Sequence, residues 1–286
     1  MSAPNQKNIL NRLLFLHIPL FLAVIYILFP IYWTLNTSLL SEEHLFSEDG
    51  VQYFPDNPTL ANYKSVLTES HLARFFVNSA IVAGCTCALL IFIATFSGYA
   101  MAKFRFRGKK AAILMLFGTQ MFPGVLLTIP LYIMLSGALR KLGISNSFIS
   151  LILPYAAFSI PFSTILMRGF FMGVPDELEE AAMVDGCSRF SAFLRISLPL
   201  TLPGIVATGI FCFIGAWNEL LLAVMMISDA KKMTLPVGLN TLIGAYEINW
   251  GHTCAAAITA LLPAMLLFGY VQRYLVGGIA SGAVKG

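Results

Sequence analysis

Long apolar stretches alternate with short polar connectors along nearly the whole chain. Most of the apolar stretches have about twenty residues or more, the length that an α-helix needs to cross the hydrocarbon core of a bilayer. The pattern predicts six membrane-spanning helices, at residues 13–35, 75–101, 111–135, 148–167, 199–227 and 255–270. We therefore expect an all-α, polytopic membrane fold that forms a single transmembrane domain over residues 1–286.

The connectors between these stretches contain most of the polar residues and turn formers. Residues 36–73 are predicted to form an external loop, and residues 174–198 a loop on the opposite side of the membrane. The glycine-rich residues 272–286 are predicted to leave the membrane as a tail. Residues 1–11 are polar, and no small-residue cleavage site follows the first span, so we expect a retained anchor that is bent near Pro19 or Pro30 rather than a signal peptide.

The composition indicates that lipid, and not water, surrounds most of this chain. Hydrophobic residues make up 58% and charged residues 11%, whereas soluble domains are about one quarter charged. Prolines inside the spans are compatible with membrane helices, because neighbouring helices satisfy the backbone groups that proline frees.

The distribution of Lys and Arg predicts the orientation. With the N-terminus inside, twelve of the eighteen cations lie on the cytoplasmic side, as the positive-inside rule requires. We expect both termini and residues 174–198 to be cytoplasmic. The cations of residues 103–110 resemble a nucleic-acid patch, but a cytoplasmic stop signal with snorkelling side chains explains them better, so no nucleic-acid partner is predicted.

The residues that usually hold metals or nucleotides are scattered or missing. The five cysteines form no Cys-x-x-Cys pair, and the four histidines form no His-x-x-x-His pair, so we predict no metal site. The chain has no Gly-x-x-x-x-Gly-Lys-Ser/Thr loop, and therefore no cofactor of its own is expected. An intramembrane enzyme would need a motif such as His-Glu-x-x-His or Gly-x-Ser-x-Gly, and neither occurs.

One connector concentrates acidic residues. Residues 174–188 contain five of the fourteen carboxylates of the chain. Asp176 is predicted to cap a helix with Glu179 as its reciprocal partner, and Gly186 to end that helix. Ser188 is predicted to cap a second helix. Ala181 and Ala182 would allow close approach of a partner, to which Glu179, Glu180 and Asp185 would offer charge; the alternative is an ordinary cytoplasmic loop with amphipathic helices.

A fixed spacing of residues favours a helix that contacts a partner over an ordinary cytoplasmic loop. Glu180-Ala181-Ala182, three residues, Gly186, nine residues, Ile196, one residue and Leu198-Pro199 resemble the EAA signature of permease subunits in binding-protein-dependent ABC importers. Residues 217–219, 234–238 and 272–286 look like the carbohydrate-uptake branch of that family, and within it like the second membrane subunit of maltose-type transporters. Cys187 stands where many relatives have alanine, a small departure because cysteine is nearly as small.

The resemblance implies a type I ABC importer permease fold in the inner membrane of a bacterium or archaeon, and a set of partners. These would be a second homologous permease, a pair of ATPase subunits that bind ATP and Mg²⁺, and an extracytoplasmic solute-binding protein that delivers a sugar. It also implies that residues 180–186 form a coupling helix seated in a cleft of the ATPase. The ATPase-coupling candidates are Glu179, Glu180, Ala181, Ala182, Asp185 and Gly186.

Polar residues inside the spans are candidates for the solute pathway. Glu219 is the acidic residue placed within a span, where an ionised side chain needs a cavity or a partner. It follows Trp217 and Asn218, an aromatic and an amide suited to a sugar; an interhelical hydrogen bond is the structural alternative. Gln120 and Tyr155 are further candidates that also suit contacts between helices. A rival hypothesis is a proton-coupled secondary transporter that uses Glu219 as its relay.

Overall fold

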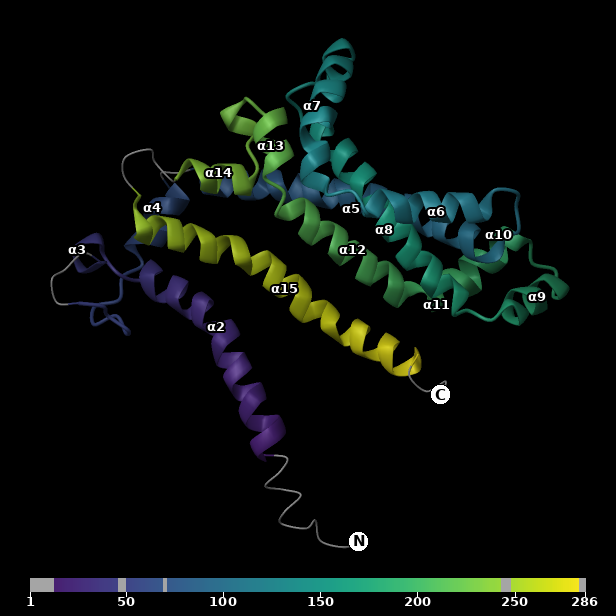
Figure 1. The fold of residues 1–286 in the computed structure, drawn as a ribbon, viewed down its shortest axis with the longest axis horizontal. Coiled ribbons are helices and arrows are strands. Elements are labelled where there is room, and N and C mark those ends of the chain that lie inside the picture. Colours follow the sequence, from purple (N-terminus) through teal and green to yellow (C-terminus); the bar gives the residue numbers. More distant parts are fainter. Residues whose placement is uncertain (1–12, 46–49, 69–70, 243–247, 283–286) are drawn as a thin grey trace, which may run out of the picture. The chain divides into compact units, whose positions relative to one another are not determined.

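A computed structural model describes residues 13–45, 50–68, 71–242 and 248–282. Most of them are helical (Figure 1). In chain order the helices are η1 (Leu13–His17), α2 (Ile18–Ser38), α3 (Glu42–Leu45), α4 (Ala61–Thr68), α5 (Leu72–Lys103), α6 (Lys109–Gln120), α7 (Gly124–Lys141), α8 (Ile149–Met172), α9 (Asp176–Val184), α10 (Arg189–Ala192), η2 (Phe193–Ser197), α11 (Leu198–Leu200), α12 (Leu202–Trp217), α13 (Leu221–Met226), η3 (Ala230–Lys232), α14 (Leu235–Thr241) and α15 (Trp250–Gly282). The predicted N-terminal segment 1–11 and the last four residues of the predicted tail lie outside the described residues.

Within the described part of the chain, five helices are long and apolar enough to cross a membrane: Leu14–Ser38, Leu72–Lys103, Gly124–Lys141, Ile149–Met172 and Trp250–Tyr270. A sixth span results if Arg189–Leu200 and Leu202–Trp217, which meet at 70°, count as one bent pair. The predicted all-α membrane fold is therefore confirmed.

The chain divides into two compact units. One contains the residues up to Leu72 together with Leu239–Leu262, and the other contains Ala73–Gly238 together with the residues from Pro263 onward.

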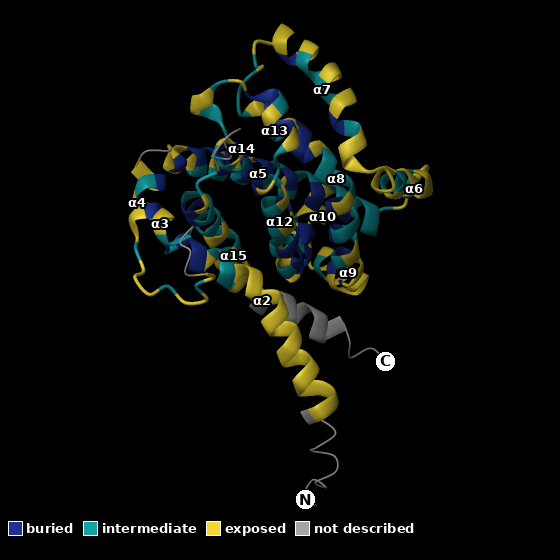
Figure 2. Ribbon diagram, turned by 60° about the vertical axis from the view of Figure 1, so that its left-hand side comes forward, coloured by how far each residue is buried: buried dark blue, intermediate teal, exposed yellow. Residues whose placement is uncertain are grey.

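In the first unit, an amide ties two helices together. Asn62 of α4 donates from Nδ2 to the carbonyl oxygens of Ser38 (3.0 Å) and Leu40 (2.8 Å), just where α2 ends. These bonds satisfy carbonyls that the end of a helix leaves without a partner. The rest of α2 is exposed along most of its length, as Figure 2 shows in yellow. An apolar helix with so much exposed surface needs lipid or another polypeptide around it.

The prediction of one continuous span at 111–135 is wrong. α6 ends at Gln120 and α7 begins at Gly124, with Pro123 as its N-cap in an extended conformation (ψ 120°). Proline lacks the backbone N–H that a continuous helix would use, and it disfavours helical geometry in the residue before it, here Phe122. A broken element consequently replaces the predicted straight helix.

The predicted span 199–227 is also interrupted, at two places. The first is the 70° bend at Thr201, just before Pro203, whose missing N–H removes a bond to the carbonyl of Pro199. The second lies between Trp217 and Leu221, where α12 stops and α13 begins. Glu219 therefore lies in a break between two helices and not inside a continuous span.

The remaining predicted spans exist, but their bounds differ. The first span ends three residues later than predicted, at Ser38, and α5 covers Leu72–Lys103 instead of 75–101. α8 extends to Met172. α15 begins at Trp250 and continues as a helix to Gly282, through the first part of the predicted tail, while the candidate span within it ends at Tyr270. Hydropathy locates the middle of a helix better than its ends, because polar residues at a helix end can remain helical.

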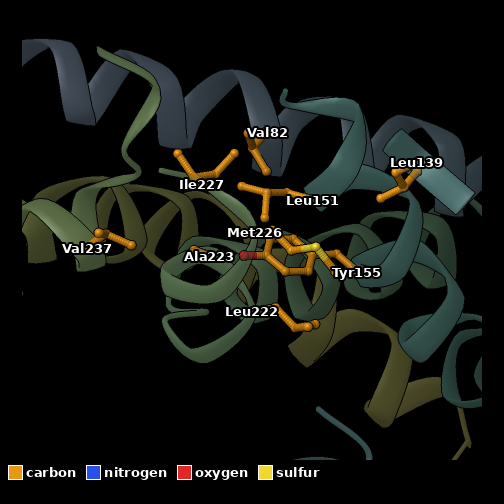
Figure 3. Packing of buried hydrophobic residues seen from close by; sticks show 9 residues of the cluster. All are labelled: Val82, Leu139, Leu151, Tyr155, Leu222, Ala223, Met226, Ile227 and Val237. Atoms are coloured by element: carbon orange, nitrogen blue, oxygen red, sulfur yellow. The ribbon is translucent and has the colours of Figure 1, made fainter. Parts of the chain in front are cut away.

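The second unit contains a buried apolar cluster on which several helices converge (Figure 3). α5, α7, α8, α13 and the residues around them supply Val82, Leu139, Leu151, Tyr155, Leu222, Ala223, Met226, Ile227 and Val237. A second cluster joins α5, α8 and η2 through Ala94, Tyr99, Met167, Phe171 and Phe193. This second cluster lies beside α9 and determines where that helix sits.

Candidate functional site

The acidic connector folds as the predicted pair of short helices, α9 and α10. α9 ends in the left-handed conformation at Gly186 (φ +89°), which favours glycine. Gly186 N–H donates to the Met183 carbonyl (3.1 Å) and Cys187 N–H donates to the Ala182 carbonyl (2.9 Å). Ser188 caps α10, because its hydroxyl accepts from the Ser191 N–H at 3.2 Å. The predictions that Gly186 ends the first helix and that Ser188 caps the second are confirmed.

The predicted cap at the start of α9 is wrong. The N-cap residue is Pro175, whose extended backbone (ψ 136°) precedes the helix, and Asp176 is already helical. The Asp176 carboxylate instead forms an ion pair with Lys103 Nζ at 2.5 Å. This pair lowers the pKa of Asp176, first through the hydrogen bond from Lys103 and second through the charge of Lys103.

One face of α9 is exposed. Glu177, Glu180, Ala181 and Val184 are spaced three or four residues apart, so they lie on one side of the helix. Val184 at the end of this face is 88% exposed. Asp185 and Gly186 continue the exposed surface, whereas Ala182 is half-buried. This outer face of α9 combines two carboxylates, Glu177 and Glu180, with the small apolar side chains of Ala181 and Val184.

The inner face of α9 carries Glu179, whose side chain is turned away from solvent. The residue is 4% exposed. Tyr99 OH donates to Glu179 Oε2 at 2.9 Å, and Ser197 Oγ donates to Glu179 Oε1. The expectation that Glu179 offers its charge to a partner is therefore wrong, since both carboxylate oxygens are engaged inside the chain.

Lys103 at the end of α5 holds the start of α9. Its Nζ donates to the Val174 carbonyl at 2.6 Å as well as to Asp176. Its side chain is only 5% exposed, so the predicted snorkelling is wrong for this lysine. Sequence reasoning also missed Tyr99 and Ser197, because a lone tyrosine or serine in an apolar helix belongs to no motif.

A groove of about 500 Å³ runs beside α9. Its walls carry both signs of charge: Lys103, Phe104, Arg105, Asp176, Glu179, Glu180, Met183 and Arg189. The Arg189 guanidinium lies over the Phe104 ring, 4.6 Å from its centroid, which fixes one cationic wall. Such a groove is suited to a protein segment that carries charges of both signs.

Tyr155 and Glu219 lie together, 64 residues apart in the chain. Tyr155 OH donates to Glu219 Oε2 at 2.5 Å. The same carboxylate accepts the backbone N–H groups of Leu222 (2.9 Å) and Ala223 (3.2 Å) at the start of α13. The Glu219 carboxylate thus accepts two N–H groups that backbone carbonyls would accept in a continuous helix.

This pair lines a cavity of about 300 Å³ among α7, α8, α12 and α13. The hydroxyls of Thr128 and Ser159 also line it, and the other lining residues are small or apolar: Gly124, Val125, Phe158, Gly215, Ala216, Leu221 and Leu222. A hydroxyl-rich solute could bond to this pair, because the Tyr155 oxygen that donates to Glu219 can still accept a hydrogen bond.

The other pathway candidates lie elsewhere. Trp217 is buried, packs edge-on against Phe76 (ring centroids 5.2 Å apart) and stacked on Phe213 (5.6 Å), and does not line the Tyr155–Glu219 cavity. Asn218 is exposed at the break after α12. Gln120, at the end of α6, lines a different cavity of about 410 Å³. The structure thus brings Tyr155 and Glu219 together and separates them from Gln120 and Trp217.

The described residues contain no group of three or more His, Cys, Asp or Glu side chains that could hold a metal ion.

Residues 90–280 match the family model described as "Binding-protein-dependent transport system inner membrane component". The match begins within α5 and continues almost to the end of α15, so it includes α9 and the Tyr155–Glu219 cavity. The chain belongs to this family. The family that the EAA spacing indicated is therefore confirmed, and a transport family agrees with the prediction of a chain that is not an enzyme.

Named relatives of this permease cover nearly its full length. The diacetylchitobiose uptake system permease protein DasC of Streptomyces coelicolor is 37% identical, and the match covers 91% of this chain and 92% of the relative. The trehalose/maltose transport system permease protein MalG of Thermococcus litoralis is 31% identical, over 98% of this chain and 99% of the relative.

Solved structures share the fold of this permease. A chain of a bacterial ABC transporter involved in the import of the acidic polysaccharide alginate superposes with a TM-score of 0.78 at 22% identity, covering 96% of this chain and 99% of that one. A bacterial alginate ABC transporter in complex with an alginate pentasaccharide-bound periplasmic protein matches with a TM-score of 0.65 at 15% identity, over 95% and 96%. The likeness to permeases of ABC transporters supports the predicted type of fold.

Proposed function

We propose that this chain is one permease subunit of an ATP-driven ABC importer that moves a di- or oligosaccharide, or a related polyol or uronate, across the inner membrane. The observation that carries the proposal is α9. The EAA residues Glu180 and Ala181 face outward on it, while Glu179 and Lys103 hold it against the spans.

In the proposed cycle, α9 is the coupling helix and sits in a cleft of a partner ATPase. The ATPase binds ATP and Mg²⁺, and its closure moves α9. The helical spans then alternate between inward-facing and outward-facing arrangements. Ala181 and Val184 fit a narrow apolar cleft, and Glu180 and Asp185 would meet cations at its rim.

The remaining partners follow from the family. A second homologous permease would cover the exposed apolar helices, and an extracytoplasmic solute-binding protein would deliver the sugar, as a periplasmic protein accompanies the alginate transporter. This arrangement requires both termini and α9 on the cytoplasmic side, which agrees with the distribution of Lys and Arg.

The class of solute rests on the relatives and on the cavity. The names of the relatives specify diacetylchitobiose and trehalose or maltose uptake. The cavity with Tyr155 and Glu219 would offer hydrogen bonds to the hydroxyls of such a solute. Trp217 is buried among other aromatic rings and is not among the residues that line this cavity.

A proton-coupled secondary transporter is less well supported. A proton relay needs a carboxylate that exchanges its proton as the transporter turns over. Glu219 instead accepts three hydrogen bonds and caps α13, an arrangement that favours a structural role for this carboxylate.

Reconstitution of the complex tests the proposal. The permease is purified with its second permease and ATPase, placed in liposomes that contain ATP, and supplied with the binding protein and radiolabelled maltose, trehalose or diacetylchitobiose. We expect uptake of at least one sugar that requires ATP hydrolysis and persists with a protonophore. Uptake by this chain alone that collapses with the proton gradient would establish the secondary transporter instead.

A further inference from the structure

Glu179 and Glu180 are adjacent, chemically identical residues that face opposite ways. Glu180 is exposed on the outer face of α9, and Glu179 is buried on the inner face. The EAA spacing includes Glu180 and leaves Glu179 out. The buried carboxylate of Glu179 therefore needs an explanation other than contact with a partner.

The two groups that bond Glu179 come from separate parts of the fold. Tyr99 lies in the last turns of α5, and Ser197 is the last residue of η2, which leads through α11 into α12. Both donors are buried, Tyr99 at 6% exposure and Ser197 at 0%. One carboxylate thereby joins α9 to the end of one long span and to the start of another.

Aromatic packing makes this junction stiff. The Tyr99 ring lies 4.5 Å from the Phe193 ring and 5.4 Å from the Phe171 ring, measured between centroids. Phe171 is in α8 and Phe193 in η2, so three helical elements meet around the tyrosine that bonds Glu179. A shift of Tyr99 relative to Glu179 would disturb close packing as well as a hydrogen bond.

The other tie between α9 and α5 is more exposed. It is the Lys103–Asp176 ion pair, whose aspartate side chain is 74% exposed. Water and salt weaken a pair of this kind. The bonds of Glu179 are shielded from water, and hydrogen bonds to an ionised group are about twice as strong as bonds between neutral groups.

We propose that Glu179 is a positioning residue that makes α9, the end of α5 and η2 move as one body. When the motor displaces α9, the bonds to Tyr99 and Ser197 pass that displacement to the spans; without them α9 would tilt on its own. This inference rests on the proposed coupling function and assigns to Glu179 a role distinct from docking.

The test measures how many sugar molecules enter per ATP hydrolysed. Glu179→Gln, Tyr99→Phe and Ser197→Ala are compared in the reconstituted complex with the wild type and with Glu43→Gln. Glu43 is the matched control, because it is an exposed glutamate of a different short helix, α3, and has no part in the proposed docking face. Tyr99→Phe and Ser197→Ala remove only one hydroxyl each, so they keep the test open if Glu179→Gln fails to assemble.

We expect the three variants to retain the ATPase subunits and, within about twofold, the rate of ATP hydrolysis. The number of sugars per ATP should fall about tenfold, the size expected when one hydrogen bond to a buried carboxylate is lost. Glu43→Gln should match the wild type. Glu179→Gln combined with Tyr99→Phe should lower the ratio by less than the product of the two separate effects, because both changes act on one bond.

Two results would overturn the inference. If the assembled variants import as many sugars per ATP as the wild type, the bonds of Glu179 do not transmit the movement of α9 to the spans. If only the Glu179→Gln complex loses the ATPase, Glu179 is part of the docking surface. The wild-type arm tests the proposed function separately. If the wild-type complex shows no ATP-driven uptake, the proposed function itself fails.

Discussion

The Tyr99 hydroxyl donates a 2.9 Å hydrogen bond to the Glu179 carboxylate, although 80 residues separate the two in the chain. The bond joins a short polar helix to a long apolar one. It also fixes the rotation of α9 about its axis, because Glu179 must face inward. That rotation is what leaves Glu180, Ala181 and Val184 on the outside.

Gly186→Asp is expected to abolish ATP-dependent uptake while membrane insertion stays normal. Gly186 is exposed next to Asp185 at the end of the outer face of α9. A new carboxylate there would enter the proposed ATPase cleft, where an unpaired charge costs several kcal/mol. Uptake by proteoliposomes and the amount of permease in the membrane are measured together.

Gly143→Asp is the matched control for that prediction. Gly143 is also exposed and left-handed (φ +70°), and for either glycine no described atom lies within 4 Å of an added Cβ. The backbone strain is therefore similar, but Gly143 lies between α7 and α8, away from α9. Transport should persist in Gly143→Asp; equal loss in both variants would point to misfolding, not to docking.

The sequence predicted the number and approximate place of the membrane helices, because a run of about twenty apolar residues matches the thickness of a bilayer and is rarely found in a soluble domain. It also predicted the end of α9 at Gly186 and the cap at Ser188, since both depend on local turn chemistry. It could not predict that Glu179 faces inward. Residues 179 and 180 are identical, and the choice between them depends on Tyr99 and Ser197, which only the folded chain brings near.

Gly98→Ala is expected to destabilise the permease. An added Cβ at Gly98 of α5 would lie 2.6 Å from Met167 Cβ and 2.9 Å from the Arg168 backbone nitrogen, so α5 and α8 would have to separate. Overpacking of this kind costs about 1–3 kcal/mol. The melting temperature of the purified complex in detergent should fall.

Gly84→Ala controls for the change in helix propensity. Gly84 lies in the same helix, and among the described atoms none is within 4 Å of its added Cβ. Alanine stabilises a helix by up to about 1 kcal/mol relative to glycine, so the melting temperature should stay level or rise. A drop as large as that of Gly98→Ala would contradict close packing of α5 on α8.

Tyr155→Phe is expected to raise the KM for sugar uptake several-fold, while kcat changes little. The variant removes the hydroxyl that donates to Glu219 and that faces the proposed solute cavity, and it keeps the two backbone bonds that cap α13. Loss of one hydrogen bond to a solute costs about 0.5–1.5 kcal/mol. Tyr132→Phe, which alters another tyrosine packed against the same core cluster, should leave KM unchanged.

The break that positions Glu219 illustrates why the pathway was harder to predict than the spans. Hydropathy runs on through residues 199–227 and gives no sign of an interruption. The interruption forms because the Glu219 carboxylate takes the N–H groups of Leu222 and Ala223, and because Tyr155 from another helix fixes that carboxylate. Trp217, two residues earlier, instead packs against the rings of Phe76 and Phe213.

Asp176→Asn is expected to lower stability by less than about 1 kcal/mol at neutral pH, because the ion pair that it removes is largely exposed on the aspartate side. Lys103 lowers the folded-state pKa of Asp176 below its ordinary value of 3.8. The contribution of the pair is therefore fully present above that ordinary value and is lost as the pH falls through the lower, folded-state pKa. The melting temperatures of wild type and variant should differ by a constant amount from pH 8 to pH 5, and the difference should shrink only below about pH 4. A gap that changes between pH 8 and pH 5 would mean that another group titrates at this site.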